Sequence, residues 1–214
     1  MTVDGAVATI GQQADAAVVD IRVDGVPLPV APDLVYYLAY KPTGVVSTAS
    51  DPEGRPTVID LVPDTPRVVP VGRLDADSEG LIVLTNDGDL TMRVTHPRYG
   101  VHKTYVALVE GIVDASLPDA LVAGLDLDDG PARALSARLI DRSSDRSIVE
   151  VVMGEGRNRI VRRMFDAAGH PVVRLTRTGI GPVTDRQLEP GTSRPLTLDE
   201  VRSLYAAAGA GNDA

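Results

Sequence analysis

Cysteine is absent from the 214-residue sequence, and aromatic residues make up only 3% of it, with no tryptophan and one phenylalanine. The lack of cysteine excludes disulfide bonds, a thiolate nucleophile and a cysteine-based zinc site. The shortage of aromatics means that Val, Leu, Ile and Ala must build the core. No apolar run approaches membrane-spanning length and no signal-peptide pattern opens the sequence, so we expect a soluble, cytoplasmic protein without a membrane segment.

A positive overall charge is also missing. The formal net charge is -9 and the isoelectric point is about 4.8, which counts against a nucleic-acid partner because phosphate binding needs a positive face. The segment Arg157–Arg177 differs from the rest, since it carries six arginines against one acid, Asp166. Taken alone, this segment is typical of a solvated helix face.

The familiar cofactor and metal motifs are missing as well. Gly154-Glu155-Gly156 lacks the ending of a phosphate-binding loop, and the three histidines lack the spacing of a zinc site. The acidic run before Gly130 lacks the glycine position and the bidentate glutamate of a calcium loop. We therefore expect no cofactor and no metal.

Hydrophobic periodicity predicts a mixed chain of helices and strands. Apolar or alternating runs predict strands over 35–39, 68–71, 81–85, 105–109, 146–153 and 172–176. The third of these strands should end in a turn at Asn86-Asp87-Gly88. Helices are predicted over 117–125 after Ser116, over 158–168 with arginines opposite an apolar stripe, and over 197–208 with a capping box. Hairpin-like turns outnumber long crossover helices, which favours antiparallel pairing.

One loop between two predicted strands can present a carboxylate to a cleft. Asp75 lies in the run Val71–Gly80, between the strands predicted over 68–71 and 81–85. An Arg-Leu-Asp loop by itself is more often a turn with a solvated acid. The loop therefore needs its surroundings to indicate chemistry.

Further motifs surround this loop and follow one another from about Leu34 to about Tyr205. They are Lys41-Pro42-Thr43-Gly44-Val45-Val46, Gly72-Arg73-Leu74-Asp75, Ser78-Glu79-Gly80-Leu81, Thr85-Asn86-Asp87-Gly88, His96-Pro97, Lys103-Thr104-Tyr105, Gly154-Glu155-Gly156-Arg157-Asn158-Arg159 and Val161-Arg162-Arg163-Met164. In this order they closely resemble the RsuA-type branch of ribosomal RNA pseudouridine synthases, and the RluB-type members in particular. One departure is Ile160, where many relatives carry Gln.

The resemblance implies a fold and an activity. The fold is α+β, the pseudouridine synthase fold, with a central mixed, mainly antiparallel sheet and flanking helices. The activity is the cofactor-free isomerisation of a specific uridine in ribosomal RNA, with the large subunit as the expected target. The implied partner is ribosomal RNA or a pre-ribosomal particle, and we expect a monomer.

The resemblance also assigns roles to individual residues. Asp75 is the catalytic carboxylate, and Tyr105 is the aromatic residue that stacks on the flipped uracil. Arg162 is our candidate for the cation paired with Asp75 in a water-poor pocket, since a guanidinium can hold a carboxylate bidentately. From the helix pattern alone, Arg162 falls on the polar side, and Tyr105 reads as a half-buried strand residue.

Four basic residues are the candidates for RNA contacts. Arg73 matches the arginine that fills the space left by a base flipped out of its stack. Lys103, Arg157 and Arg159 are the candidates for phosphate contacts. Exposed basic residues are common on any surface, so these three depend on the resemblance more than Arg73 does.

The N-terminal segment differs in character from the rest. It predicts two short strands, around Ala6–Ile10 and Val19–Val23, and then a proline-containing linker. The resemblance implies that residues 1–30 are the remnant of an alpha-L RNA-binding domain whose opening helices are missing. We expect the catalytic domain over 31–208 and a flexible tail over 209–214.

Two other classes of function compete with this interpretation. A non-catalytic RNA-binding or ribosome-assembly protein on the same fold would not need the Asp75, Tyr105 and Arg162 set. An aspartate-dependent hydrolase of small substrates would suit the acidic isoelectric point, but it lacks a second catalytic carboxylate or a metal site with recognisable spacing.

Overall fold

The computed structural model describes residues 1–9, 11–12, 14, 19–27 and 34–209. Within these ranges, nine strands form one main sheet, four strands form a small N-terminal sheet and two form a hairpin. The strands are β1 Thr2–Val3, β2 Ala6–Val7, β3 Ile21–Val23, β4 Val26–Pro27, β5 Tyr36–Lys41, β6 Val69–Pro70, β7 Glu79–Thr85, β8 Lys103–Glu110, β9 Leu125–Leu127, β10 Gly130–Ala132, β11 Ser136–Arg142, β12 Arg146–Met153, β13 Val172–Ile180, β14 Val183–Thr184 and β15 Ser193–Pro195. The helices are α1 Gly88–Thr95, α2 Leu117–Ala123, α3 Ile160–Ala167 and α4 Leu198–Gly209, with 3-10 turns at Val58–Leu61 and Pro97–Tyr99.

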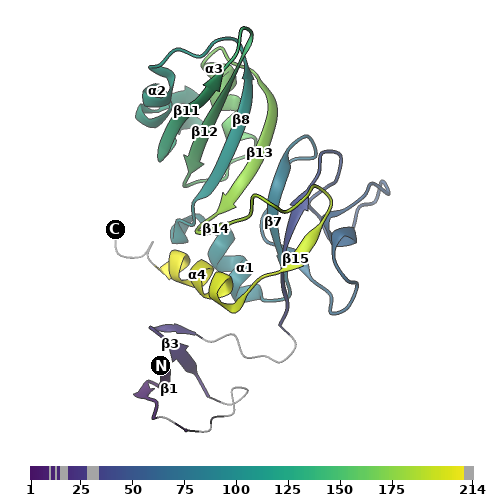
Figure 1. Ribbon diagram of the computed structural model, residues 1–214, viewed down its shortest axis with the longest axis vertical. Helices are drawn as coiled ribbons and strands as arrows, with labels where there is room; N and C mark the ends of the chain where they lie inside the picture. The colour runs from purple at the N-terminus through teal and green to yellow at the C-terminus, as the bar shows by residue number, and fades with distance from the viewer. Residues whose placement is uncertain (10, 13, 15–18, 28–33, 210–214) are drawn as a thin grey trace.

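The main sheet runs in the order β11-β12-β8-β13-β7-β5-β15, with β14 beside β13 and β6 beside β7. The β13–β7 pair is parallel, whereas the other pairs described in this sheet are antiparallel. Figure 1 shows the sheet as two halves that meet where β13 passes beside β7. The predicted α+β fold with a mixed, mainly antiparallel sheet is therefore confirmed.

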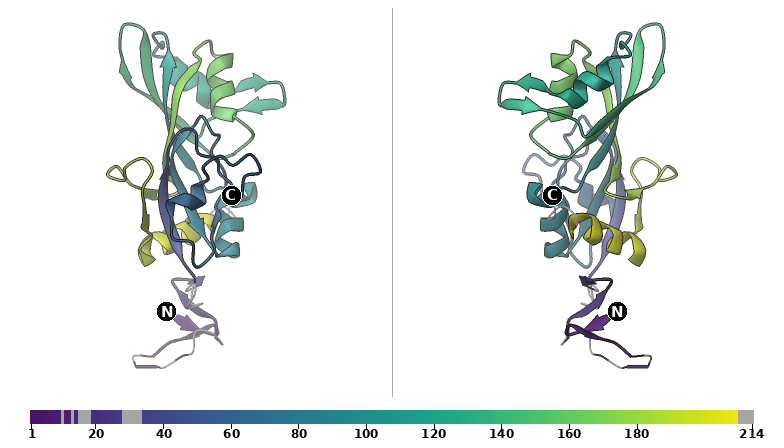
Figure 2. Two further views of the ribbon diagram at one scale, coloured as in Figure 1. Left: turned by 90° about the vertical axis from the view of Figure 1, so that its right-hand side faces the viewer. Right: turned by 90° about the vertical axis from the view of Figure 1, so that its left-hand side faces the viewer.

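The half formed by β11, β12, β8 and β13 carries α2 and α3 on one face, as the side views in Figure 2 show. Its core joins apolar residues of these helices and strands, among them Leu121, Val149 and Phe165. The apolar stripe predicted along 158–168 is confirmed, since Ile160, Val161, Met164 and Phe165 are all buried. Arg162 was expected on the polar side of this helix, but it is buried too, with 7% of its surface exposed.

The other half is built on β7, which is buried along its whole length. The helices α1 and α4 contact each other and contribute to the same core as β7. The predicted capping box of α4 is present, because Glu200 accepts from the Thr197 amide at 2.8 Å and the Thr197 hydroxyl accepts from the Glu200 amide at 3.2 Å. The turn predicted at 86–88 is wrong: Asp87 instead caps α1 by accepting from the amides of Asp89 and Leu90.

The parallel junction between the halves depends on a glycine. Gly80 has a φ of +111°, and a Cβ built on it would lie 2.2 Å from the backbone oxygen of Arg177. Backbone atoms cannot move aside as a flexible side chain can, so this close approach of β7 to β13 requires a residue without a side chain.

The N-terminal strands form a separate sheet in the order β2-β1-β3-β4, with the expected turn at Asp24-Gly25 leading into β4. Figure 1 places this sheet next to α4, and Val26 packs against the core that α4 helps to build. Most of the predicted linker and the tail from residue 210 onward lie outside the described residues. In the described part of the chain, no helix is long and apolar enough to cross a membrane.

Candidate active site

The Val71–Ser78 loop is held from several sides. The amide of Val71 donates to the Val83 carbonyl at 2.8 Å, which ties the loop to β7. The hydroxyl of Ser47 accepts from the Leu74 amide at 3.0 Å and donates to the Leu74 carbonyl at 2.9 Å. Leu74 itself is buried. The residue immediately before Asp75 is thus fixed through both backbone polar groups and its side chain.

A tight turn then presents Asp75. The Ser78 amide donates to the Asp75 carbonyl at 3.0 Å, and the Gly44 amide donates to the Ala76 carbonyl at 2.7 Å. The Asp75 side chain is 35% exposed, and its Oδ2 lies 3.7 Å from Nη1 of Arg159. The expected water-poor pocket is therefore not present in the RNA-free protein, because a third of this side chain remains in contact with solvent.

Arg162 has a different partner from the one predicted. Its Nε lies 3.5 Å from Oδ2 of Asp77, and its Nη2 donates to the Asp77 carbonyl at 2.8 Å. Its Nη1 donates to the Val172 carbonyl at 3.1 Å. Because these contacts hold the guanidinium under the loop, Arg162 supports the Asp75 turn from below and is not an ion-pair partner of Asp75 within 4 Å.

Beside Asp75 lies a cavity of about 270 Å³ between the two halves of the sheet. We call this cavity the cleft. Six of the seven residues predicted for the site line it, and Arg162 is the exception: Arg73, Asp75, Lys103, Tyr105, Arg157 and Arg159. Chain segments far apart in the sequence therefore meet at one place.

Lys103 and Tyr105 reach the cleft from β8. The ammonium of Lys103 donates to the carbonyls of Val94 at 2.8 Å and Val101 at 2.6 Å. Burial, with a smaller contribution from the nearby Arg177 guanidinium, lowers the pKa of Lys103 to about 8. Tyr105 is half-buried and packs against the core beneath α3.

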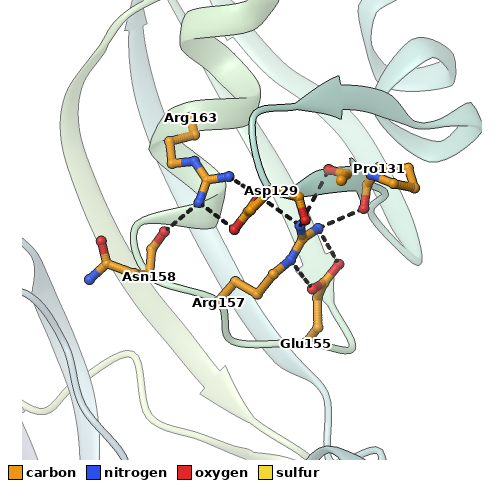
Figure 3. A network of polar contacts seen from close by, with 7 residues as sticks. Asp129, Pro131, Glu155, Arg157, Asn158 and Arg163 are labelled. Carbon is orange, nitrogen blue, oxygen red and sulfur yellow. Dashed lines mark hydrogen bonds and ion pairs between the residues drawn. The ribbon is translucent and has the colours of Figure 1, made fainter.

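Arg157 lies in a closed polar network, drawn in Figure 3. Its guanidinium donates to Asp129 at 2.8 Å, to Glu155 at 2.7 Å and to the carbonyl of Pro131 at 2.7 Å. Arg163 shares Asp129. The side chain predicted to contact phosphate is therefore bonded to the β9–β10 hairpin and to its own loop in the RNA-free protein.

Two buried cations next to the cleft were not among the predicted site residues. Lys41, which is 0% exposed, donates to the carbonyls of Pro42 at 2.9 Å and Val45 at 2.7 Å. Burial lowers its pKa to about 8, although the nearby carboxylates of Asp77 and Asp75 oppose this shift. Arg177 donates to the carbonyls of Leu81 and Arg73. Lys41 could have been found from the Lys-Pro motif, whereas Arg177 carries no comparable signal.

Metal ligands are not gathered near this site. Within the described ranges, no group of three or more His, Cys, Asp or Glu side chains could hold a metal ion. What the cleft offers is one partly exposed carboxylate, one tyrosine and several cations.

The family model described as RNA pseudouridylate synthase matches residues 35–167, which include the Asp75 turn, Tyr105 and the start of α3. The chain belongs to this family. The resemblance inferred from the motifs is thereby confirmed, and the protein is an enzyme of the pseudouridine synthase type.

Individual relatives agree with this assignment. An "Uncharacterized RNA pseudouridine synthase" of Mycobacterium leprae is 47% identical, with 97% of this chain and 83% of the relative covered. The "Ribosomal large subunit pseudouridine synthase B" of Bacillus subtilis is 44% identical, with 84% and 75% covered. A solved structure titled "Crystal structure of pseudouridylate synthase" has a TM-score of 0.71 at 31% identity and covers 95% of this chain and 87% of that one. These relatives support the RluB-type branch.

Proposed function

We propose that this enzyme converts a specific uridine of ribosomal RNA to pseudouridine and that Asp75 is its catalytic carboxylate. The observation that carries this proposal is the fixed, partly exposed Asp75 carboxylate at the wall of a cleft that Tyr105 also lines. The names of relatives such as the B. subtilis large-subunit synthase support the large subunit as the source of the RNA.

The reaction needs little beyond these groups. The bond between the sugar and N1 of uracil breaks, a bond from the same sugar carbon to C5 forms, C5 loses its proton and N1 gains one. The product is an isomer of the substrate, so no electron donor or acceptor is required. A carboxylate next to the sugar can either attack the anomeric carbon or remove a proton from the sugar. We assign this role to Asp75, and we assign stacking on the flipped base to Tyr105.

The base must leave its stack to reach Asp75, which costs a few kcal/mol, as a rough figure. Arg73 is suited to fill the vacated space. Its side chain is exposed, and within the described part of the chain its guanidinium has no hydrogen-bond or ion-pair partner.

The other basic side chains of the cleft are bonded within the protein. Lys103, Arg157 and Arg159 would each have to exchange a protein acceptor for an RNA phosphate before contacting it. We propose that this exchange accompanies binding of ribosomal RNA or of a pre-ribosomal particle to a monomeric enzyme in the cytoplasm. For residues 1–30, we propose an accessory RNA-contacting role beside the catalytic domain.

The test is pseudouridine formation on ribosomal RNA fragments from a strain that lacks the enzyme, with wild type compared with Asp75→Asn. Asp199→Asn is a matched control, because Asp199 is also a surface aspartate near an arginine but lies on α4. We expect product at one position with wild type and the control, and none with Asp75→Asn. Product formation by Asp75→Asn would refute the assignment of the carboxylate. If wild type binds RNA but forms no product on naked RNA or on assembly intermediates, a non-catalytic assembly role replaces the proposed activity.

A further inference from the structure

Asp77 stands two residues after the proposed catalytic carboxylate, and it is paired with two arginines. Arg159 holds it bidentately, with Nη1 at 3.0 Å from Oδ1 and Nη2 at 2.9 Å from Oδ2. Arg162 approaches the same carboxylate from the buried side. The hydrogen bond from Arg159 and the charge of Arg162 hold the pKa of Asp77 below its usual range. Asp77 is thus an anion that orients two cations of the α3 region.

The contrast with Asp75 shows what this arrangement does. Within the described residues, the carboxylate oxygens of Asp75 accept no hydrogen bond, and the contact with Arg159 is the longer one, at 3.7 Å. A bidentate pair uses both terminal nitrogens of the Arg159 guanidinium in one plane. The geometry therefore leaves Asp75 next to a positive charge while its oxygens stay free for the sugar.

From this contrast we propose that Asp77 is a positioning residue that holds Arg159 away from Asp75 and so keeps the catalytic carboxylate available. This inference rests on the proposed function, because it takes Asp75 as the reacting group. Without Asp77, Arg159 could close the short remaining distance to Asp75 and occupy the oxygens that the substrate needs. Arg162 would also lose the carboxylate that faces it and with it part of its hold on the turn.

A contribution to folding alone does not account for this pair. The side chains of Asp77 and Arg159 are 50% and 42% exposed, and ion pairs with this much solvent contact add little to stability. Arg162 keeps its bonds to backbone carbonyls when only the charge of Asp77 is removed. The Asp77→Asn protein should therefore fold like wild type, so that a change in rate can be assigned to the site.

The measurement is steady-state kinetics of pseudouridine formation for wild type, Asp77→Asn, Asp77→Glu and the control Asp199→Asn. For Asp77→Asn we expect kcat to fall by about 100-fold, the order seen for misplaced catalytic groups, with KM changed less than about 3-fold and an unchanged melting temperature. Asp77→Glu keeps the charge and should recover most of the loss. Adding Arg159→Gln to Asp77→Asn should raise kcat again, because it removes the cation that blocks Asp75.

Several outcomes would overturn the proposal. A wild-type kcat in Asp77→Asn would show that the carboxylate has no positioning role. A lower KM with an unchanged kcat would mean that Asp77 instead competes with an RNA phosphate for Arg159. A double variant slower than Asp77→Asn would contradict the blocking mechanism. If wild type itself forms no pseudouridine, the proposed function fails, and this result is distinct from all three.

Discussion

Replacing Gly80 with alanine should separate the two halves of the sheet where β7 meets β13. The new methyl group would lie 2.2 Å from the Arg177 oxygen and 2.6 Å from its nitrogen. Overpacking against a rigid neighbour costs about 1–3 kcal/mol, and a positive φ in a residue with a side chain costs about 1–3 kcal/mol. We expect Gly80→Ala to lower the free energy of unfolding by about 2–6 kcal/mol, a large share of the roughly 5–15 kcal/mol that holds a domain together.

Urea unfolding followed by circular dichroism measures this loss, and two glycines provide matched controls. Gly191 has a φ of +83° but open space around its Cβ position, so Gly191→Ala reports the backbone strain alone. Gly88 has open space and begins α1 without a positive φ, so Gly88→Ala should stay within about 0.5 kcal/mol of wild type. Equal unfolding midpoints for Gly80→Ala and Gly191→Ala would refute the claim that the close approach of the two strands is costly to disturb.

Three further predictions concern buried polar groups. The folded-state pKa of about 8 for Lys41 and Lys103 lies below the usual 10.5, so the unfolded chain binds protons more tightly and stability should rise between pH 8 and 10.5, by up to roughly 3 kcal/mol per lysine; urea titrations of wild type and Lys103→Met test this, and a flat wild-type profile would contradict it. Tyr205→Phe removes a 2.6 Å hydrogen bond to buried Asp87 and should cost about 1.5–3 kcal/mol in thermal unfolding. Glu79→Gln removes the charge that holds an arginine, a threonine and a tyrosine across β13 and β5, and we expect a loss of about 1–3 kcal/mol; a melting temperature equal to that of wild type would show that the cluster is dispensable.

The elements with strong periodicity were predicted well. The strand over 146–153 was found with the bounds of β12, because its alternating apolar residues face the core on one side only. Helix α1 was missed because Asn86-Asp87-Gly88 is typical of a tight turn, while Asp87 is also a good N-cap. A sequence offers both interpretations, and the buried hydroxyls of Tyr36 and Tyr205 that bind Asp87 come from distant segments.

The edge strands were beyond prediction for a different reason. β9, β10 and β15 are three residues long, and the outer strand β11 has no residue in the buried class. Such strands are formed by pairing with a neighbour and not by their own hydrophobic pattern. Their neighbours could not be identified from local sequence.

In the site, the composition of the cleft was predicted from the motifs, but the pairing of its charges was not. The motifs indicated the Asp75 loop, Tyr105 and the arginines around α3, and six of the seven named residues line the cleft. The choice of Asp77 over Asp75 as the partner of Arg162 could not be read from the sequence. An arginine side chain reaches several acceptors, and the selection depends on backbone carbonyls that lie far away in the chain.

The internal pairing of Arg157, Arg159 and Arg163 with carboxylates bears on how ionic strength acts on the enzyme. A free cation that neutralises a phosphate of single-stranded RNA releases about 0.7 condensed counterions into bulk solution. Here each phosphate would displace a carboxylate, and that carboxylate then recruits a counterion of its own. The net number of ions released per contact falls towards zero, so RNA affinity should depend on salt concentration far more weakly than the count of arginines in the cleft suggests. A shallow slope of log affinity against log salt is thus the signature of an acidic protein that carries its own anions into an RNA-binding cleft.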